Sequence, residues 1–154
     1  MKLTDLLQKG DAPNIEVTGI SADSRDITPG MIFAALPGVK VDGFDFIPKA
    51  IENGALAVIS DRDFDGAVHH IQSENPRQTL ATLAARFYGR QPETIVAVTG
   101  SNGKTSVAHF TRQIWQMMNY KAASLGTIGL EADGIIKDGA MTTPDPVVPR
   151  LAAL

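Results

Sequence analysis

A short segment in the second half of the chain combines the residue types that hold a phosphate group. Residues 99–106 read Thr-Gly-Ser-Asn-Gly-Lys-Thr-Ser. The glycines let successive backbone N–H groups point toward an anion, the lysine can reach the outer phosphates, and the threonine after it offers a hydroxyl to Mg²⁺. This spacing predicts the binding of ATP-type phosphates, and a plain structural turn is the alternative.

The positions of this loop differ in their expected roles. Gly100 and Gly103 provide backbone freedom, whereas Lys104 supplies the positive charge. Lys104 and Thr105 are the candidate catalytic residues, and Thr105 is the candidate Mg²⁺ ligand beside the nucleotide phosphates. Val98 stands where the general pattern has a further glycine, so the loop is shorter than usual. The candidate ATP-binding residues are Gly100, Ser101, Asn102, Gly103, Lys104, Thr105 and Ser106.

Two flanking elements must position the loop. The apolar run Thr94–Val98 predicts a fully buried strand, and the apolar spacing after the loop predicts a helix from about Lys104 to Met118. A strand, a glycine loop and a helix in this order begin an α/β unit. The side chains expected to share one face of the helix are Val107, Phe110, Ile114 and Met118.

The first half of the chain alternates between helical and strand patterns. The clearest helix lies between Asn75 and Gly89, because Asn75 is a good N-cap, Pro76 suits the first helical position, and glycine can end a helix. Leu80, Leu83 and Phe87 form its inner stripe. We expect a domain boundary after it, which gives domains 1–90 and 91–154. The other expected elements are a helix in Met1–Lys9, strands in Ile15–Ile20, Met31–Leu36 and Leu56–Ile59, and a helix through Phe46, Ala50, Ile51 and Ala55.

Composition narrows the class of protein. The 154 residues are 44% hydrophobic and 20% charged, as in folded globular chains, and they include no cysteine. Disulfides and thiolate zinc sites are therefore excluded. The net charge of −3 argues against a nucleic-acid partner, although residues 94–130 contain three bases and no acid. With no long apolar run, we expect no membrane partner and a cytoplasmic location. For the histidines at 69, 70 and 109 we expect surface or helix-packing roles rather than catalytic ones.

The loop Gly100–Thr105 resembles that of the Mur ligase family. Three further stretches resemble the MurE branch of this family, and they keep its order along the chain. The first is Asp23-Ser24-Arg25 with residues 29–38 and 42–43 downstream, the second is Leu125–Gly129, and the third is Thr142–Pro146. The resemblance runs over essentially all of the sequence.

This resemblance implies a fold and a reaction. The fold would be α/β, with a small N-terminal UDP-binding domain followed by the start of a P-loop ATPase domain with a mainly parallel sheet. The reaction would be ATP-dependent amide formation between UDP-N-acetylmuramoyl-L-alanyl-D-glutamate and a diamino acid, diaminopimelate or lysine, in peptidoglycan biosynthesis. Members of the family are considerably longer than this chain, so we expect it to be a part of such a ligase that is inactive alone. The whole ligase is expected to be monomeric.

The resemblance also implies substrate contacts outside the loop. UDP-sugar contacts are implied around Ser24 and at Thr142-Thr143. For the segment around Ser24, the alternative is a turn in which Arg25 pairs with a neighbouring carboxylate. For Thr142-Thr143, the alternative is a plain turn. Two other functions stay open: a sister-branch ligase of the folylpolyglutamate or cyanophycin synthetase type, and a non-catalytic module that binds a UDP-sugar or nucleotide. The implied UDP-sugar contacts are Ala22, Ser24, Val39, Lys40, Val41, Thr142 and Thr143.

Overall fold

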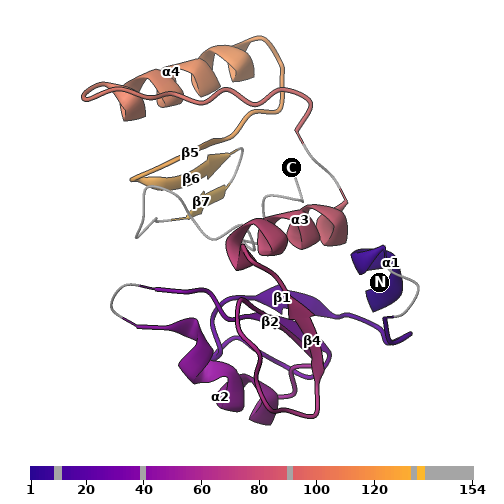
Figure 1. The fold of residues 1–154 in the computed structure, drawn as a ribbon. Helices are drawn as coiled ribbons and strands as arrows, with labels where there is room; N and C mark the ends of the chain where they lie inside the picture. Colours follow the sequence, from indigo (N-terminus) through magenta and orange to yellow (C-terminus); the bar gives the residue numbers. More distant parts are fainter. Residues whose placement is uncertain (9–11, 39–40, 90–91, 133–134, 138–154) are drawn as a thin grey trace. The chain divides into compact units, whose positions relative to one another are not determined.

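The computed structural model describes residues 1–8, 12–38, 41–89, 92–132 and 135–137, and it divides the chain into two compact units (Figure 1). The first unit is Met1–Arg90 and the second is Gln91–Leu154. The elements of the first unit are α1 (Leu3–Leu7), β1 (Gly19–Ser21), β2 (Met31–Ala34), the 3₁₀ helix η1 (Gly43–Phe46), α2 (Ile47–Glu52), β3 (Ala57–Ser60), β4 (His69–Gln72) and α3 (Pro76–Tyr88).

A parallel sheet with the strand order β1-β2-β3-β4 organises the first unit. Side chains alternate between its faces, and Phe33 and Val58 pack on one face against Ile47 and Ala50 of α2. The other face is covered by α3, which contacts β2 and β3 and also packs on α1 (Figure 1). Because both faces are covered, the central strands are almost continuously apolar. This sheet confirms the α/β class.

Helix α3 forms as its sequence predicts. The Asn75 side chain accepts a hydrogen bond from the backbone N–H of Gln78 at 3.1 Å, and Pro76 occupies the first turn. Gly89 follows the helix with φ +70°, a conformation that favours glycine. Leu80 and Leu83 are buried, as expected.

Strand β4 was not predicted. Its sequence, His-His-Ile-Gln, has no apolar run to indicate a strand. His69 and His70, for which surface or helix-packing roles were expected, lie on this strand at the edge of the sheet. Both are half-buried on β4, where Nε2 of His70 lies 2.7 Å from Oγ of the fully buried Ser60 on β3. Pairing with β3 therefore places two polar residues on the last strand of the sheet.

The second unit contains α4 (Lys104–Met117) and the strands β5 (Ser124–Gly126), β6 (Gly129–Ala132) and β7 (Ile135–Lys137). The order is β5-β6-β7, and both pairings are antiparallel. The mainly parallel sheet expected for this part of the chain is therefore not seen among its described residues. In the described ranges of both units, the helices are too short or too polar to span a bilayer.

The predicted strand Thr94–Val98 is wrong for this structure. Residues 92–99 have no strand, and Ile95 is 75% exposed. A buried strand needs hydrogen-bonding neighbours, and the strands described in this unit pair with one another instead. The apolar face of α4 is formed where it was predicted, but its side chains are exposed rather than packed.

Candidate phosphate site

The loop before α4 has a backbone suited to an anion. Gly100 and Gly103 have φ of +140° and +77°, both in the region that favours glycine. A methyl group added at Gly103 would meet no heavy atom within 4 Å, so the surroundings of this glycine are open. The glycines are therefore needed for the course of the chain, which brings residues 100–103 to the start of the helix.

The N-terminus of α4 leaves donors for a ligand. Gly103 precedes the helix, and no side chain in the described ranges caps it. The first-turn N–H groups of a helix have no partner within the helix, and its dipole favours negative charge there. The first turn contains no acidic residue. This end of α4 consequently attracts an anion.

Lys104 places its ammonium group over the same loop. Its Nζ donates to the carbonyl oxygen of Gly100 and lies 3.4 Å from the carbonyl oxygen of Ser101. The side chain therefore folds back along the loop, with its charge beside the backbone of residues 100–103. An ammonium group at this position can meet phosphate oxygens bound by the loop.

Thr105 presents the hydroxyl that could bind Mg²⁺. It is exposed, and its Oγ1 lies 3.3 Å from Oγ1 of Thr127. No group of three or more histidine, aspartate or glutamate side chains in the described ranges could hold a metal ion. Mg²⁺ commonly takes few protein ligands and completes its shell with phosphate oxygens and water. A single threonine hydroxyl beside a phosphate loop fits that pattern.

The predicted UDP-sugar residues of the first unit lie on loops that leave one edge of its sheet. Ala22 and Ser24 follow β1 and Val41 follows β2, and these two strands are parallel neighbours. Their carboxyl ends therefore share an edge, where ligands of open α/β sheets bind. Ser24 is buried and Val41 is exposed. Val39, Lys40, Thr142 and Thr143 lie outside the described residues.

Two arginines that the sequence did not single out connect the loops at this edge. Arg62, after β3, pairs with Asp42 at 2.5 Å and stacks over the ring of Phe44 at 4.4 Å. Arg77, in the first turn of α3, donates to the carbonyl oxygen of Pro37 at 2.8 Å. Both contacts span distant parts of the sequence, so spacing alone could not reveal them.

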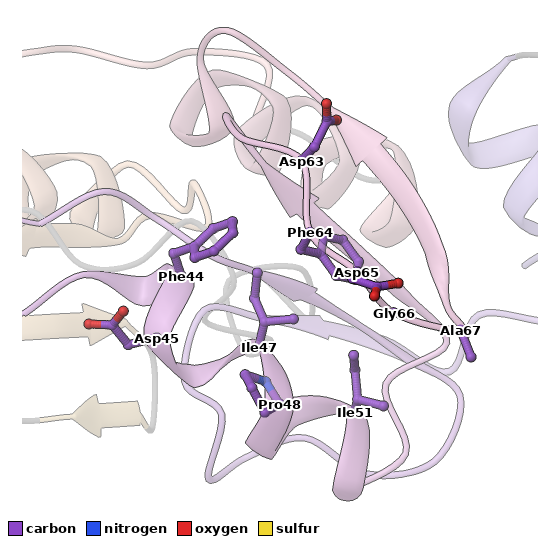
Figure 2. Close-up of a pocket in the computed structure, with 10 residues that line it drawn as sticks. All are labelled: Phe44, Asp45, Ile47, Pro48, Ile51, Asp63, Phe64, Asp65, Gly66 and Ala67. Atoms are coloured by element: carbon purple, nitrogen blue, oxygen red, sulfur yellow. The ribbon is translucent and has the colours of Figure 1, made fainter.

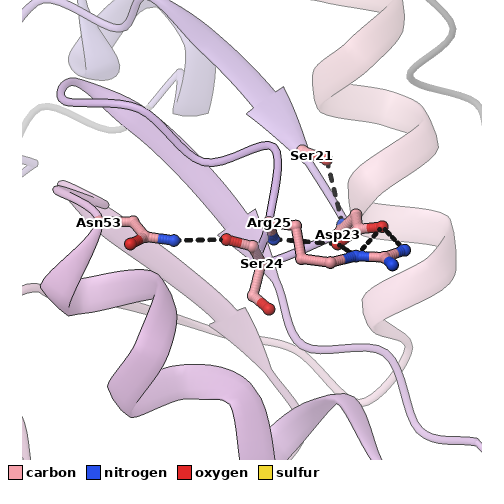
Figure 3. A network of polar contacts seen from close by, with 5 residues as sticks. All are labelled: Ser21, Asp23, Ser24, Arg25 and Asn53. Atoms are coloured by element: carbon pink, nitrogen blue, oxygen red, sulfur yellow. Dashed lines mark hydrogen bonds and ion pairs between the residues drawn. The ribbon is translucent and has the colours of Figure 1, made fainter.

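The Ser24 segment forms the turn that was the alternative interpretation. Arg25 pairs with Asp23 through its Nε and a terminal nitrogen, and the backbone N–H of Arg25 donates to the same carboxylate (Figure 3). The backbone carbonyl of Ser24 accepts from Nδ2 of Asn53 at 2.8 Å. Figure 3 shows the Ser24 hydroxyl directed away from the ion pair. The turn therefore leaves that hydroxyl outside the pair.

The ion pair changes the acidity of Asp23. Hydrogen bonds from the Arg25 side chain and backbone lower the pKa of Asp23 from 3.8 to about 2. The depressed pKa means that the pair stabilises the fold above about pH 4 and that this contribution is lost as the pH falls through about 2. We expect the Asp23 carboxyl to titrate near 2 by NMR and the Arg25→Gln variant to titrate closer to 3.8. A normal midpoint in the unmodified chain would contradict the geometry.

A pocket of about 740 Å³, separate from the predicted sites, lies in the first unit beside η1 and α2. Its walls are mainly apolar, and Figure 2 shows the carboxylates of Asp45 and Asp63 directed away from it. It contains none of the predicted site residues. The lining residues are Phe44, Asp45, Ile47, Pro48, Ile51, Asp63, Phe64, Asp65, Gly66 and Ala67.

Two family models match successive parts of the chain. Residues 16–88 match the catalytic domain of the Mur ligase family, and residues 98–153 match the Mur ligase middle domain. This chain belongs to the Mur ligase family. The second match contains the phosphate loop and α4, and the first contains all four strands of the parallel sheet.

Two curated relatives of this chain carry the same name. A UDP-N-acetylmuramoyl-L-alanyl-D-glutamate--2,6-diaminopimelate ligase of Mesorhizobium japonicum is 48% identical over 96% of this chain and 32% of its own length. The protein of the same name from Rhizobium meliloti is 47% identical over 96% of this chain and 33% of its own length. This chain thus spans about a third of the length of these curated relatives.

Solved structures of Mur ligases are similar to the chain as well. A structure of UDP-N-acetylmuramoyl-L-alanyl-D-glutamate--2,6-diaminopimelate ligase matches 99% of this chain and 32% of its own, with a TM-score of 0.77 and 27% identity. The MurF ligase of Thermotoga maritima in complex with ADP matches 68% of this chain and 24% of its own, with a TM-score of 0.57 and 33% identity.

Proposed function

We propose that this chain supplies the ATP-phosphate site and part of the UDP-sugar site of an ATP-dependent amide ligase of the MurE type. The reaction would join a diamino acid, with diaminopimelate preferred over lysine, to UDP-N-acetylmuramoyl-L-alanyl-D-glutamate during peptidoglycan biosynthesis. The names and identities of the relatives support the substrate. The observation that carries the proposal is the loop at residues 100–106, which combines an uncapped helix N-terminus with a lysine and a hydroxyl.

The residues of the loop would act on the phosphates of ATP. N–H groups between Gly100 and Ser106 bind phosphate oxygens, and Lys104 moves from the carbonyls of its own loop to the outer phosphates. Lys104 thereby offsets charge on the γ-phosphoryl group as it passes from ATP to the D-glutamate γ-carboxylate, which becomes an acyl phosphate while ADP leaves. Mg²⁺, bound beside Thr105, supplies further positive charge at the phosphates. The amine of the diamino acid then attacks the acyl phosphate and expels phosphate.

The two units would divide this work. Residues 1–90 bind the UDP-sugar at the carboxyl edge of the parallel sheet, and residues 91–154 begin the ATP-binding domain. Ala22, Ser24 and Val41 are the described contacts of the sugar nucleotide in this proposal, with Ser24 donating or accepting through its hydroxyl. A whole ligase of this type would be monomeric. It would act in the cytoplasm, where ATP is available as the energy source.

Calorimetry with the unmodified chain and with Ser24→Ala tests the assignment of the first unit. Loss of one hydroxyl contact is expected to weaken binding of UDP-N-acetylmuramoyl-L-alanyl-D-glutamate by about 3- to 10-fold. Binding of ATP with Mg²⁺ serves as the control, because it should not change. A chain that binds ATP but ignores the UDP-sugar would instead support a sister-branch ligase, and equal sugar affinity in both proteins would remove Ser24 from the site.

A further inference from the structure

The tip of the β5–β6 hairpin lies beside the hydroxyl of Thr105. Gly126 pairs with Gly129 in this hairpin, so Thr127 and Ile128 form its two-residue turn. Helix α4 and strand β5 are in contact, and Oγ1 of Thr127 lies 3.3 Å from Oγ1 of Thr105. The phosphate loop is thus accompanied by a second hydroxyl that belongs to another element.

The hairpin is also tied to α4 further along the helix. Oε2 of Glu131 on β6 accepts from Arg112 at 2.8 Å and lies 2.8 Å from Nδ1 of His109. Arg112 and Glu131 are largely buried, with 13% and 19% of their side chains exposed. Charge-assisted hydrogen bonds of this kind fix geometry better than exposed pairs do. They therefore hold the hairpin turn close to the first turn of the helix.

A hydroxyl that gives a lone pair to a metal still carries a proton that needs an acceptor. Groups that accept such protons orient the ligand and strengthen metal binding. Resting on the proposed function, we propose that Thr127 is a positioning residue: its Oγ1 accepts the Thr105 hydroxyl proton and turns the Thr105 lone pairs toward the Mg²⁺ of bound ATP. This role belongs to a residue outside the phosphate loop.

The test compares Thr127→Val, which keeps the shape but removes the acceptor, with Thr127→Ser, which restores a hydroxyl. ATP binding to the 154-residue chain is measured in EDTA and during a Mg²⁺ titration. For Thr127→Val we expect the Mg²⁺ midpoint to rise about 10-fold, with unchanged metal-free ATP affinity. Thr127→Ser should restore the midpoint. Thr111→Val, the same chemical change further along α4, is the matched control and should behave as the unmodified chain.

An unchanged Mg²⁺ midpoint in Thr127→Val would overturn the inference while leaving the proposed function intact. An equal loss of metal-free ATP affinity, or a failure of Thr127→Ser to restore the midpoint, would show a merely structural role and would also overturn it. If the unmodified chain bound ATP in neither condition, the proposed function would fail, and this inference with it.

Discussion

Replacing Lys104 by methionine is expected to weaken ATP binding by roughly 10- to 150-fold. The estimate follows from the loss of about 1.5–3 kcal/mol for a hydrogen bond to a charged group. Methionine keeps much of the length of the side chain but removes both the charge and the hydrogen-bond donors of the ammonium group. Lys104 already lies along the loop, with Nζ at the carbonyl oxygens of Gly100 and Ser101, so its ammonium group is close to the expected position of the phosphates. Calorimetric titration with ATP and Mg²⁺ measures the change.

Lys121→Met is the matched control for this experiment. Lys121 is exposed, follows α4, and lies outside the loop, yet its replacement changes the net charge by the same amount. We expect ATP affinity close to that of the unmodified chain. Equal losses in the two variants would point to a general effect of charge, and no loss in Lys104→Met would remove this lysine from the phosphate site.

Replacing Phe33 by alanine is expected to destabilise the first unit by about 3–5 kcal/mol. Phe33 lies on β2 in the middle of the parallel sheet, and only 1% of it is exposed. It belongs to the buried cluster that joins the sheet to Ile47 and Ala50 of α2, so a smaller side chain leaves a cavity there. Urea unfolding followed by circular dichroism measures the free energy.

Phe46→Ala serves as the comparison in the same unit. Phe46 ends η1 and is 41% exposed, so its removal opens less of a cavity, and we expect a loss below about 1 kcal/mol. A loss for Phe33→Ala no larger than for Phe46→Ala would contradict the assignment of Phe33 to the core.

Local signals predicted the best-formed parts of the fold. Asn75, Pro76 and Gly89 each act within one helical turn, and they give α3 the bounds that the sequence predicts. The apolar run after Gly30 likewise gives β2, because a strand buried on both faces needs continuous apolar residues. Where local preference and tertiary packing agree, the sequence is sufficient.

The structural features that the sequence did not predict depend on residues far apart in the chain. Strand β4 exists because His69 and His70 pair with β3, and nothing in their own sequence shows this. The run 94–98 has strand propensity, but the described strands of its unit do not pair with it. The phosphate loop was identifiable because its residues are contiguous, whereas Thr127 is 22 positions from Thr105. Its only sequence signal was its place in the Leu125–Gly129 segment.

The proposed function requires the backbone N–H groups of residues 100–106 to bind the phosphates of ATP. The most direct measurement follows the backbone amide signals of the ¹⁵N-labelled chain by NMR while ATP with Mg²⁺, or adenosine as the control, is added. We predict large saturable shifts for Gly100 to Ser106 with ATP and none with adenosine. If these amides did not shift with ATP, or shifted equally with adenosine, the phosphate site would not lie in this loop.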